Sequence, residues 1–463
     1  MSKYNFGVGQ SRIKEILKSI GSRVHFVGVG GVGMYSLFRL TELCGVRVSG
    51  SDREASPLTE RLISRGKSVS IGHRWKNAVG ASLIVYTLAV GEDNPELLYG
   101  KKNDIPTVTR AEYLGALMEE YKEKIGVSGT HGKSTTAAMI DAVFKSAKKE
   151  PTTLIGAIVP GEDEPLRIGG ENYLIYEACE YKDSFLHFSP TAAAFTNLEL
   201  DHVDYFKDID SIRLSFLRAM DASGFSVVNY DDENLRSLME RTRAKCISYG
   251  MGEGADYRIF ITSSENGLYS FKIRHEERDR VNVSLKVPGK FNVMNAAAAA
   301  AISLEFGIPE SCIESALSGF LGVGRRLESI GKYKGAEVYY DYAHHPTEIE
   351  CSIRAVKEMH HGRIAVIFKP HTYSRTAAFI DGFAAALSLA DSAFICEVSG
   401  VRECNTFGVS SQELVSKIGS GAQYVSDECG VSNILSAGYD AIIIMGAANL
   451  DTVRASFFGN SGK

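Results

Sequence analysis

The stretch Ile125–Phe144, IGVSGTHGKSTTAAMIDAVF, joins an apolar run to a glycine-rich turn and then to a regular helical pattern. The apolar run Ile125–Gly129 predicts a strand, and the spacing from Lys133 to about Ala147 predicts a helix. A strand that leads through a glycine-rich turn into a helix is typical of parallel α/β sheets that bind phosphates. The stretch therefore predicts an α/β domain with an anion site at this turn.

The turn has the chemistry of a phosphate-binding loop. In Gly132-Lys133-Ser134, backbone N–H groups can cradle phosphates, Lys133 can reach the β- and γ-phosphate oxygens, and the Ser134 hydroxyl can bind Mg²⁺. The usual first glycine of such a loop is absent, because Val127 stands there, and an unrelated glycine-rich turn is the alternative. The candidate ATP-binding residues of the loop are Gly129, Thr130, His131, Gly132, Lys133, Ser134 and Thr135.

A second glycine-rich loop lies upstream, at Gly28–Gly33 (GVGGVG). We expect a strand over His25–Val29, a helix over Met34–Leu43 and a second strand that leads to Asp52, which completes a βαβ unit. Glycines there let the backbone approach a pyrophosphate, and Asp52 can hydrogen-bond a ribose. The pattern suits a dinucleotide or a nucleotide sugar without identifying the ligand, and a tight structural turn is the alternative. The candidate residues are Gly28, Gly30, Gly31, Gly33 and Asp52.

Length and pattern together predict an α/β protein of three domains. At ~150 residues per domain, a chain of 463 residues suggests about three. We expect a Rossmann-like domain over residues 1–122, a central P-loop domain over 123–322 and a C-terminal α/β domain over 323–463 that closes on the other two. Within the central domain, the runs in 257–287 predict an antiparallel β flap appended to a parallel sheet.

Composition and charge exclude several classes of protein. The chain has 44% apolar residues, an ordinary value for a globular protein, and its formal charge of −5 gives no general attraction to nucleic acid. Its eight cysteines form no Cys-x-x-Cys pair, which is typical of reduced cytosolic thiols. The first twenty residues lack a signal-peptide pattern, and no apolar run reaches the ~18 residues of a membrane span. We therefore expect a cytoplasmic protein with no membrane span and no nucleic-acid partner.

The run Gly-Thr-His-Gly-Lys-Ser after a strand resembles the ATP loop of the Mur ligase family, whose members add amino acids to peptidoglycan precursors. Other blocks of the chain resemble the family in the same order: HFVGVGGVGM (25–34), YEACEYKDSFL (176–186), TNLELDHVDYF (196–206), GKFNVMNAAAA (289–299), GVGRRLE (322–328), DYAHHPTE (341–348) and FKPHTYSRT (368–376). The resemblance implies an ATP-dependent ligase that joins UDP-N-acetylmuramate to L-alanine. It further implies Mg²⁺ or Mn²⁺ as the metal and a monomer or homodimer.

The resemblance also implies roles for central-domain residues outside the loops. Glu177 would bind Mg²⁺ beside Ser134, and His202 would bind a second metal ion. A surface carboxylate and a capping or core histidine are the respective alternatives. Asn292 and Asn295 would contact adenine through their amide groups, with helix capping as the alternative for Asn292.

The third domain would complete the site after it closes. Arg326, beside Arg325, would then reach the γ-phosphate, unless the pair is simply solvated. Strand ends that face a cleft bind ligands in open α/β sheets. The candidates there for the ATP ribose, the acyl phosphate and the amino acid are Asp341, His344, His345, His371 and Arg375. The residues expected to carry the catalysis are Lys133, Glu177, His202, Arg326 and His345.

Three other functions stay open from the sequence. A ligase that adds a preformed peptide to the same UDP-sugar would share the ATP site and differ only in the pocket for the amine. An NAD(P)-dependent oxidoreductase built on Gly28–Gly33 would leave Lys133 without a role. A non-catalytic, ATP-regulated binding protein is supported only by Met445–Leu450 (MGAANL), which departs from the family pattern, as Phe291 also does.

Overall fold

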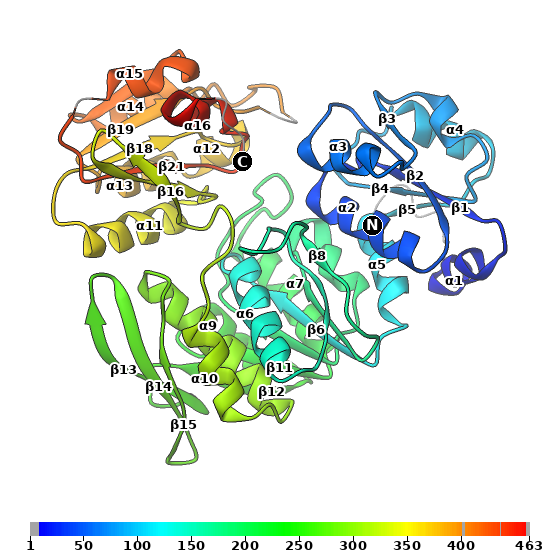
Figure 1. Ribbon diagram of the computed structural model, residues 1–463, viewed down its shortest axis with the longest axis horizontal. Helices are drawn as coiled ribbons and strands as arrows, with labels where there is room; N and C mark the ends of the chain where they lie inside the picture. The colour runs from blue at the N-terminus through cyan, green and yellow to red at the C-terminus, as the bar shows by residue number, and fades with distance from the viewer. Residues whose placement is uncertain (1–8, 401–402, 436, 460–463) are drawn as a thin grey trace.

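The computed structural model describes residues 9–400, 403–435 and 437–459. It has three lobes, each built on one sheet (Figure 1). The first eight residues, on which part of the expectation about a leader segment rests, lie outside the described residues. Within the described ranges, no helix combines the length and the apolar character that crossing a bilayer requires.

The N-terminal sheet has five parallel strands in the order β3-β2-β1-β4-β5. Its strands are β1 (Arg23–Val27), β2 (Arg47–Asp52), β3 (Val69–Ile71), β4 (Leu83–Tyr86) and β5 (Thr107–Thr109). The helices of this lobe are α1 (Gln10–Lys18), α2 (Val32–Leu43), α3 (Pro57–Ser64), η1 (Trp75–Ala78), α4 (Pro95–Lys102) and α5 (Arg110–Met118). Because β1 leads directly into the glycine loop and α2, the predicted Rossmann-like βαβ unit is confirmed.

The central sheet has ten strands in the order β15-β14-β13-β12-β11-β10-β6-β9-β7-β8. They are β6 (Glu123–Ser128), β7 (Thr152–Leu154), β8 (Leu166–Arg167), β9 (Tyr173–Glu177), β10 (Ala192–Phe195), β11 (Phe225–Asn229), β12 (Lys245–Gly250), β13 (Tyr257–Glu265), β14 (Leu268–His275) and β15 (Arg278–Ser284). The last three are antiparallel and extend the parallel sheet beyond β12, so the predicted flap is confirmed. Figure 1 shows them projecting from one end of the central lobe.

Helices cover the central sheet and bury its apolar strands. They are α6 (Lys133–Ser146), η2 (Tyr181–His187), α7 (Ile209–Asp221), α8 (Glu233–Met239), α9 (Lys290–Glu305) and α10 (Glu310–Ser318). The six alanines of α9, Ala296–Ala301, are fully buried, and α9 packs against α6. Small side chains allow this close approach, so the alanine run holds the helix that follows the phosphate-binding loop in place.

The C-terminal sheet has six strands in the order β16-β17-β21-β18-β19-β20, with only β16 antiparallel to its neighbour. They are β16 (Glu328–Tyr333), β17 (Ala336–Asp341), β18 (Ile364–Phe368), β19 (Ser392–Cys396), β20 (Ala422–Val425) and β21 (Ala441–Met445). The helices are α11 (Pro346–Met359), α12 (Tyr373–Ala378), α13 (Ile380–Leu387), α14 (Ser411–Ile418), η3 (Glu428–Gly430), α15 (Val431–Ile434) and α16 (Asp451–Phe458). This lobe is the third α/β unit that the strand and helix pattern predicts.

A buried ion pair joins the C-terminal lobe to the central lobe. Arg375 donates from Nε to Asp201 Oδ1 at 2.9 Å and from Nη2 to Asp201 Oδ2 at 3.2 Å. The two side chains are only 8% and 4% exposed. Burial by itself would raise the pKa of Asp201, but the Arg375 guanidinium outweighs burial and holds the pKa well below its ordinary value. This buried ion pair therefore holds the two lobes together, and removal of either side chain would leave the other as an unpaired buried charge.

We predict that Asp201→Asn loosens this contact, because it leaves the Arg375 guanidinium buried against a neutral amide. Loss of one partner of a buried pair costs about 3 kcal/mol or more, so the lobes of the variant should separate in part of the population. Small-angle X-ray scattering should show a larger radius of gyration than for the unchanged protein. The control Asp210→Asn removes a carboxylate that is 84% exposed and paired with Arg213 at the surface, and its scattering should not change. Equal scattering from all three proteins would contradict the prediction.

Candidate active site

The predicted phosphate-binding loop lies between β6 and α6. Gly129 and Gly132 have φ of +141° and +81°, which L side chains rarely adopt. A Cβ at Gly129 would also collide with Thr196, and one at Gly132 would collide with Asn295. Asn197 holds the loop from outside: its carbonyl accepts from Thr130 N–H at 3.1 Å, and its side-chain oxygen accepts from His131 N–H at 2.8 Å. The backbone of the loop is thus in place before any ligand binds.

Lys133 is held inside this loop by a carboxylate that the sequence reasoning did not single out. Its Nζ lies 3.0 Å from Glu180 Oε2 and 3.1 Å from the Thr130 carbonyl. The Glu180 side chain is only 1% exposed. Burial lowers the pKa of Lys133, but Glu180 outweighs burial and raises it above its ordinary value. Lys133 is therefore charged, and Glu180 neutralises this charge inside the loop.

The two predicted metal ligands, His202 and Glu177, have different partners in the structure. His202 Nε2 is 3.6 Å from Glu180 Oε1, and the imidazole packs on the Tyr181 ring. Glu177, at the end of β9, instead accepts a hydrogen bond from the Gly156 N–H. The carboxylate that pairs with both Lys133 and His202 is therefore Glu180. The signal available in the sequence was its place three residues after Glu177 in the block YEACEYKDSFL.

A cavity between the central and C-terminal lobes brings together most of the predicted ATP-binding residues. Those that line it are His131, Gly132, Thr135, Asn292, Asn295, Arg326 and Asp341. The cavity is also lined by polar residues that sequence reasoning missed, namely Asn197, Glu199, Asn229, Thr347 and Glu348. Asn197 and Glu199 belong to the block 196–206, and Thr347 and Glu348 to the block 341–348, but these blocks do not show which of their residues face a common cavity. Only the folded chain shows them together.

The asparagines of this cavity are held by neighbouring polar groups. Asn295 donates to the Asn292 side-chain oxygen at 3.1 Å, and its own oxygen is 3.3 Å from Thr136 Oγ1. Asn292 donates to the Pro288 carbonyl at 2.7 Å. The capping alternative for Asn292 is wrong, because the N-cap of α9 is Gly289, which makes no side-chain capping bond.

Arg326 reaches the phosphate-binding loop from the C-terminal side. Its Nη2 lies 3.5 Å from Ser134 Oγ, and its guanidinium lies over the Tyr342 ring. Its neighbour Arg325 points away, toward the carbonyls of Gly446 and Ala448 at 3.3 and 3.4 Å. Of the two arginines, Arg326 is thus the one that meets the loop.

The other C-terminal candidates gather at the start of α11 and beside α12. His345 is 5% exposed, and its Nδ1 lies 3.5 Å from Glu199 Oε2. Burial lowers the pKa of His344 to about 3 and raises the pKa of Asp341 above its ordinary value. His371 Nδ1 lies 3.5 Å from Arg375, whose guanidinium is bound to Asp201. Arg375 therefore serves first as the buried link between the two lobes.

The upstream glycine loop is organised by Asp52. Its Oδ2 accepts from Gly30 N–H at 2.7 Å, so the carboxylate holds the loop backbone. A second cavity opens where this loop faces the central lobe. It is lined by Gly31 and Gly33 from the predicted set, and by Arg110, Glu177 and Cys179, which the sequence did not connect with the loop.

The comparisons with known proteins cover all three lobes. Three family models match: "Mur ligase family, catalytic domain" over residues 23–122, "Mur ligase middle domain" over 127–303 and "Mur ligase, glutamate ligase domain" over 325–448. The UDP-N-acetylmuramate–L-alanine ligase of Caldicellulosiruptor bescii is 40% identical over 88% of this chain and 91% of its own length.

Two solved structures have the same architecture. The crystal structure of UDP-N-acetylmuramate–alanine ligase from Thermotoga maritima is 27% identical, with a TM-score of 0.81 over 94% of this chain and 98% of that one. A murein peptide ligase from Psychrobacter arcticus, 23% identical with a TM-score of 0.74, shares the fold over 96% of this chain and 100% of its own. Because three family models match the three lobes and the Caldicellulosiruptor protein is 40% identical, the chain belongs to the Mur ligase family.

Proposed function

We propose that this protein joins the lactyl carboxylate of UDP-N-acetylmuramate to the amine of L-alanine, with conversion of ATP to ADP and phosphate. The observation that carries the proposal is the meeting of Lys133, Ser134 and Arg326 at one phosphate-binding loop, with Arg326 coming from a different lobe. Relatives named for this reaction, such as the 40% identical protein of Caldicellulosiruptor bescii, support the choice of substrates. The reaction is one step of peptidoglycan precursor synthesis.

The chemistry explains why such a site needs several positive groups. A carboxylate and an amine do not condense at neutral pH, so a carboxylate oxygen first attacks the γ-phosphorus and ADP leaves. The amine nitrogen then attacks the carbonyl carbon of the acyl phosphate, and inorganic phosphate leaves. Lys133 and Arg326 are placed to offset the negative charge on the transferred phosphoryl group. His345 and His371 are candidates for contacts with the acyl phosphate and the amino acid.

We propose that the UDP-sugar and ATP bind in the two cavities. The UDP-sugar would lie at the loop of Gly28, Gly30, Gly31 and Gly33, where Asp52 holds the backbone. ATP would lie in the cavity beside α9, with its adenine near Asn292 and Asn295 and its ribose near Asp341. The lactyl carboxylate would then extend from the sugar cavity, past Glu177 and Cys179 in its lining, toward the γ-phosphate.

The residues at the loop fit a divalent metal ion bound with ATP. Ser134 offers a hydroxyl, His202 an imidazole and Glu180 a buried carboxylate. Glu177, the metal ligand expected from the sequence, also lies near Lys133. Oxygen donors of this kind suit Mg²⁺, and Mn²⁺ accepts the same ligands. The ion would supply charge neutralisation at the phosphates.

We also propose the domain limits 1–122, 123–322 and 323–463, and a cytoplasmic enzyme that acts as a monomer or homodimer. The three matched segments fall inside these limits. The cysteines of the described chain are all free thiols, which supports a reducing compartment.

The identity of the amine that accepts the acyl group can be tested by phosphate release. Phosphate release from ATP should require both UDP-N-acetylmuramate and L-alanine, because the acyl phosphate forms only on the sugar and is consumed only by the amine. The assay compares L-alanine, glycine, L-serine, a tripeptide and no amine. Release that favours the tripeptide would move the assignment to the peptide-adding ligase. No release with any amine, despite ATP binding, would leave the ATP-regulated binding protein.

A substitution tests the role of Lys133 in turnover. Lys133→Ala should reduce turnover by at least about 100-fold, since a preorganised charge at the transferred group is lost. UDP-N-acetylmuramate binding, measured by calorimetry, should be unchanged because its cavity lies at another loop. Lys149→Ala, at an exposed position after α6, is the matched control. Loss of sugar binding together with turnover would point to misfolding of the variant.

Two substitutions test which carboxylate at the end of β9, Glu177 or Glu180, binds the metal ion. Glu180→Gln removes the partner of both Lys133 and His202, so it should raise the Mg²⁺ concentration needed for half-maximal turnover by about tenfold or more. Glu177→Gln keeps the side-chain oxygen that accepts from Gly156 and should change this concentration less. A larger effect from Glu177→Gln would assign the metal to Glu177, as the resemblance implies.

A further inference from the structure

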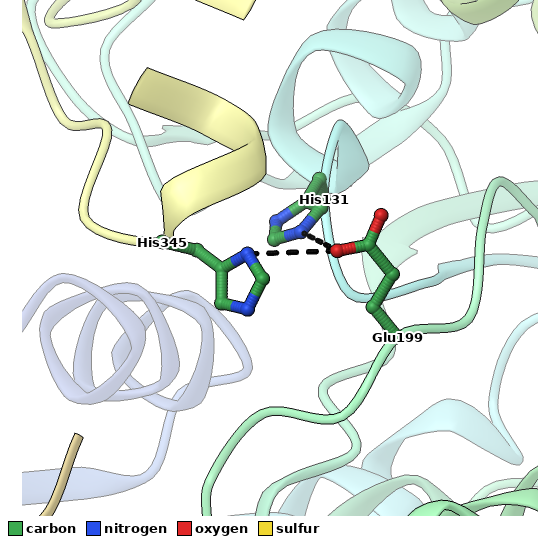
Figure 2. A group of neighbouring side chains, drawn as sticks. All are labelled: His131, Glu199 and His345. Atoms are coloured by element: carbon green, nitrogen blue, oxygen red, sulfur yellow. Dashed lines mark ion pairs between the residues drawn. The ribbon is translucent and has the colours of Figure 1, made fainter. Parts of the chain in front are cut away.

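Three side chains outside the metal-binding set meet across the boundary between two lobes. His131 comes from the phosphate-binding loop, Glu199 from the segment after β10, and His345 from the N-terminus of α11 (Figure 2). One ligand atom from each lies within 4.8 Å of the other two. Figure 2 shows both imidazole rings turned toward the Glu199 carboxylate.

The separations in this cluster are wrong for hydrogen bonds. His131 Nε2 and His345 Nδ1 each lie 3.5 Å from Glu199 Oε2, beyond the range of about 2.7–3.2 Å for an N–H···O bond. Of the two ring atoms that face Glu199, His131 Nε2 is buried and makes no hydrogen bond with the described part of the chain, and His345 Nδ1 accepts only a long hydrogen bond from Thr347 N–H at 3.4 Å. Buried polar atoms rarely stay without a partner, so the cluster calls for an additional one.

The same separations suit a tetrahedral metal ion. Ligand atoms about 2.0–2.1 Å from Zn²⁺ lie about 3.3–3.4 Å from one another in a tetrahedron, close to the 3.5 Å between Glu199 and each histidine. Two imidazoles and one carboxylate are a common protein ligand set for zinc, with the fourth position left for water or a ligand. Imidazole-rich sites favour Zn²⁺, Co²⁺ and Ni²⁺ over Mg²⁺.

The groups around the cluster complete this arrangement. His131 Nδ1 lies 3.2 Å from Glu348 Oε1, and a metal-binding histidine usually donates its second ring N–H to a carboxylate. Thr347 Oγ1 donates to Glu199 Oε2 at 2.7 Å and so orients the carboxylate. Glu348 is in turn held by the backbone N–H of His344 at 3.0 Å. Two of the three side chains, His131 and Glu199, are thus oriented by neighbouring groups.

We propose that His131, Glu199 and His345 bind one zinc-type divalent transition-metal ion, separately from the metal bound with ATP. The site shares His131 and Glu199 with the proposed ATP cavity, and its test requires neither ATP nor turnover. Because two ligands belong to the central lobe and one to the C-terminal lobe, an ion there ties α11 to the phosphate-binding loop and stabilises the closed arrangement.

Calorimetry on the full-length, ATP-free protein after chelator treatment tests the site with Zn²⁺ as the probe. One ion should bind, and Glu199→Gln and His345→Asn should each weaken its binding by at least about tenfold. Gln keeps an acceptor for Thr347, and Asn is a good N-cap residue for α11, so both variants should fold. The exposed His361→Asn is the matched control and should bind Zn²⁺ normally.

The variant His202→Asn distinguishes this site from the nucleotide site. Zn²⁺ affinity that survives His202→Asn but falls in both cluster variants supports the proposal. Affinity lost only in His202→Asn, or unchanged in both cluster variants, overturns it. Circular dichroism and the thermal unfolding midpoint of each metal-free variant exclude misfolding as the cause of a loss.

The variant Asp201→Asn tests whether the ion bridges the lobes, because the Arg375–Asp201 link between them is broken in this variant. Saturating Zn²⁺ should reduce the radius of gyration of this variant measured by small-angle scattering. The reduction should be absent when His345→Asn is added. Zn²⁺ binding without compaction would place the ion on the central lobe alone and overturn the bridge.

Discussion

The buried ion pair between Lys133 and Glu180 is the interaction on which the electrostatics of the site depend. Both side chains lie in a pocket from which water is largely excluded, and an unpaired charge there is costly. Without a nucleotide, Glu180 neutralises the lysine and keeps it beside the loop backbone. In the proposed complex, bound phosphates would compete for the same ammonium group and would free Glu180 to interact with His202 or a cation. One carboxylate thereby couples the lysine to the expected metal position.

The second constraint is that no lobe holds the site alone. The central lobe provides the loop that contains Lys133, Arg326 and His345 come from the C-terminal lobe, and the glycine loop Gly28–Gly33 comes from the N-terminal one. Arg375 and Asp201 hold the C-terminal lobe in position through a buried bidentate pair. Asp201 directly precedes His202 in the chain, so this link lies beside the contact between His202 and Glu180. Movement of the C-terminal lobe therefore changes the composition of the site as well as access to it.

Much of the fold was predictable from local patterns, and residue contacts were less so. The strand before Lys133, the flap over 257–287 and the alanine-rich helix are recognisable because each depends on short-range periodicity or composition. The Asp52 side chain accepts from Gly30 N–H, and the Asn292 side chain donates to the carbonyl of Pro288. Both contacts join a side chain to a backbone group in a particular loop geometry, which periodicity does not contain.

The sequence by itself determined the family, the α/β class, the two glycine loops and the position of Lys133 at a helix N-terminus, because these follow from contiguous residues. Only the tertiary structure decided that Glu180 partners Lys133, that Arg375 is bound to Asp201, and that His131, Glu199 and His345 converge. Within the Arg375–Asp201 pair and within the His131, Glu199 and His345 cluster, the residues lie 68 to 214 positions apart in the chain. Their contacts arise from the packing of one lobe on another, which depends on many weak interactions at once and leaves no local pattern in the sequence.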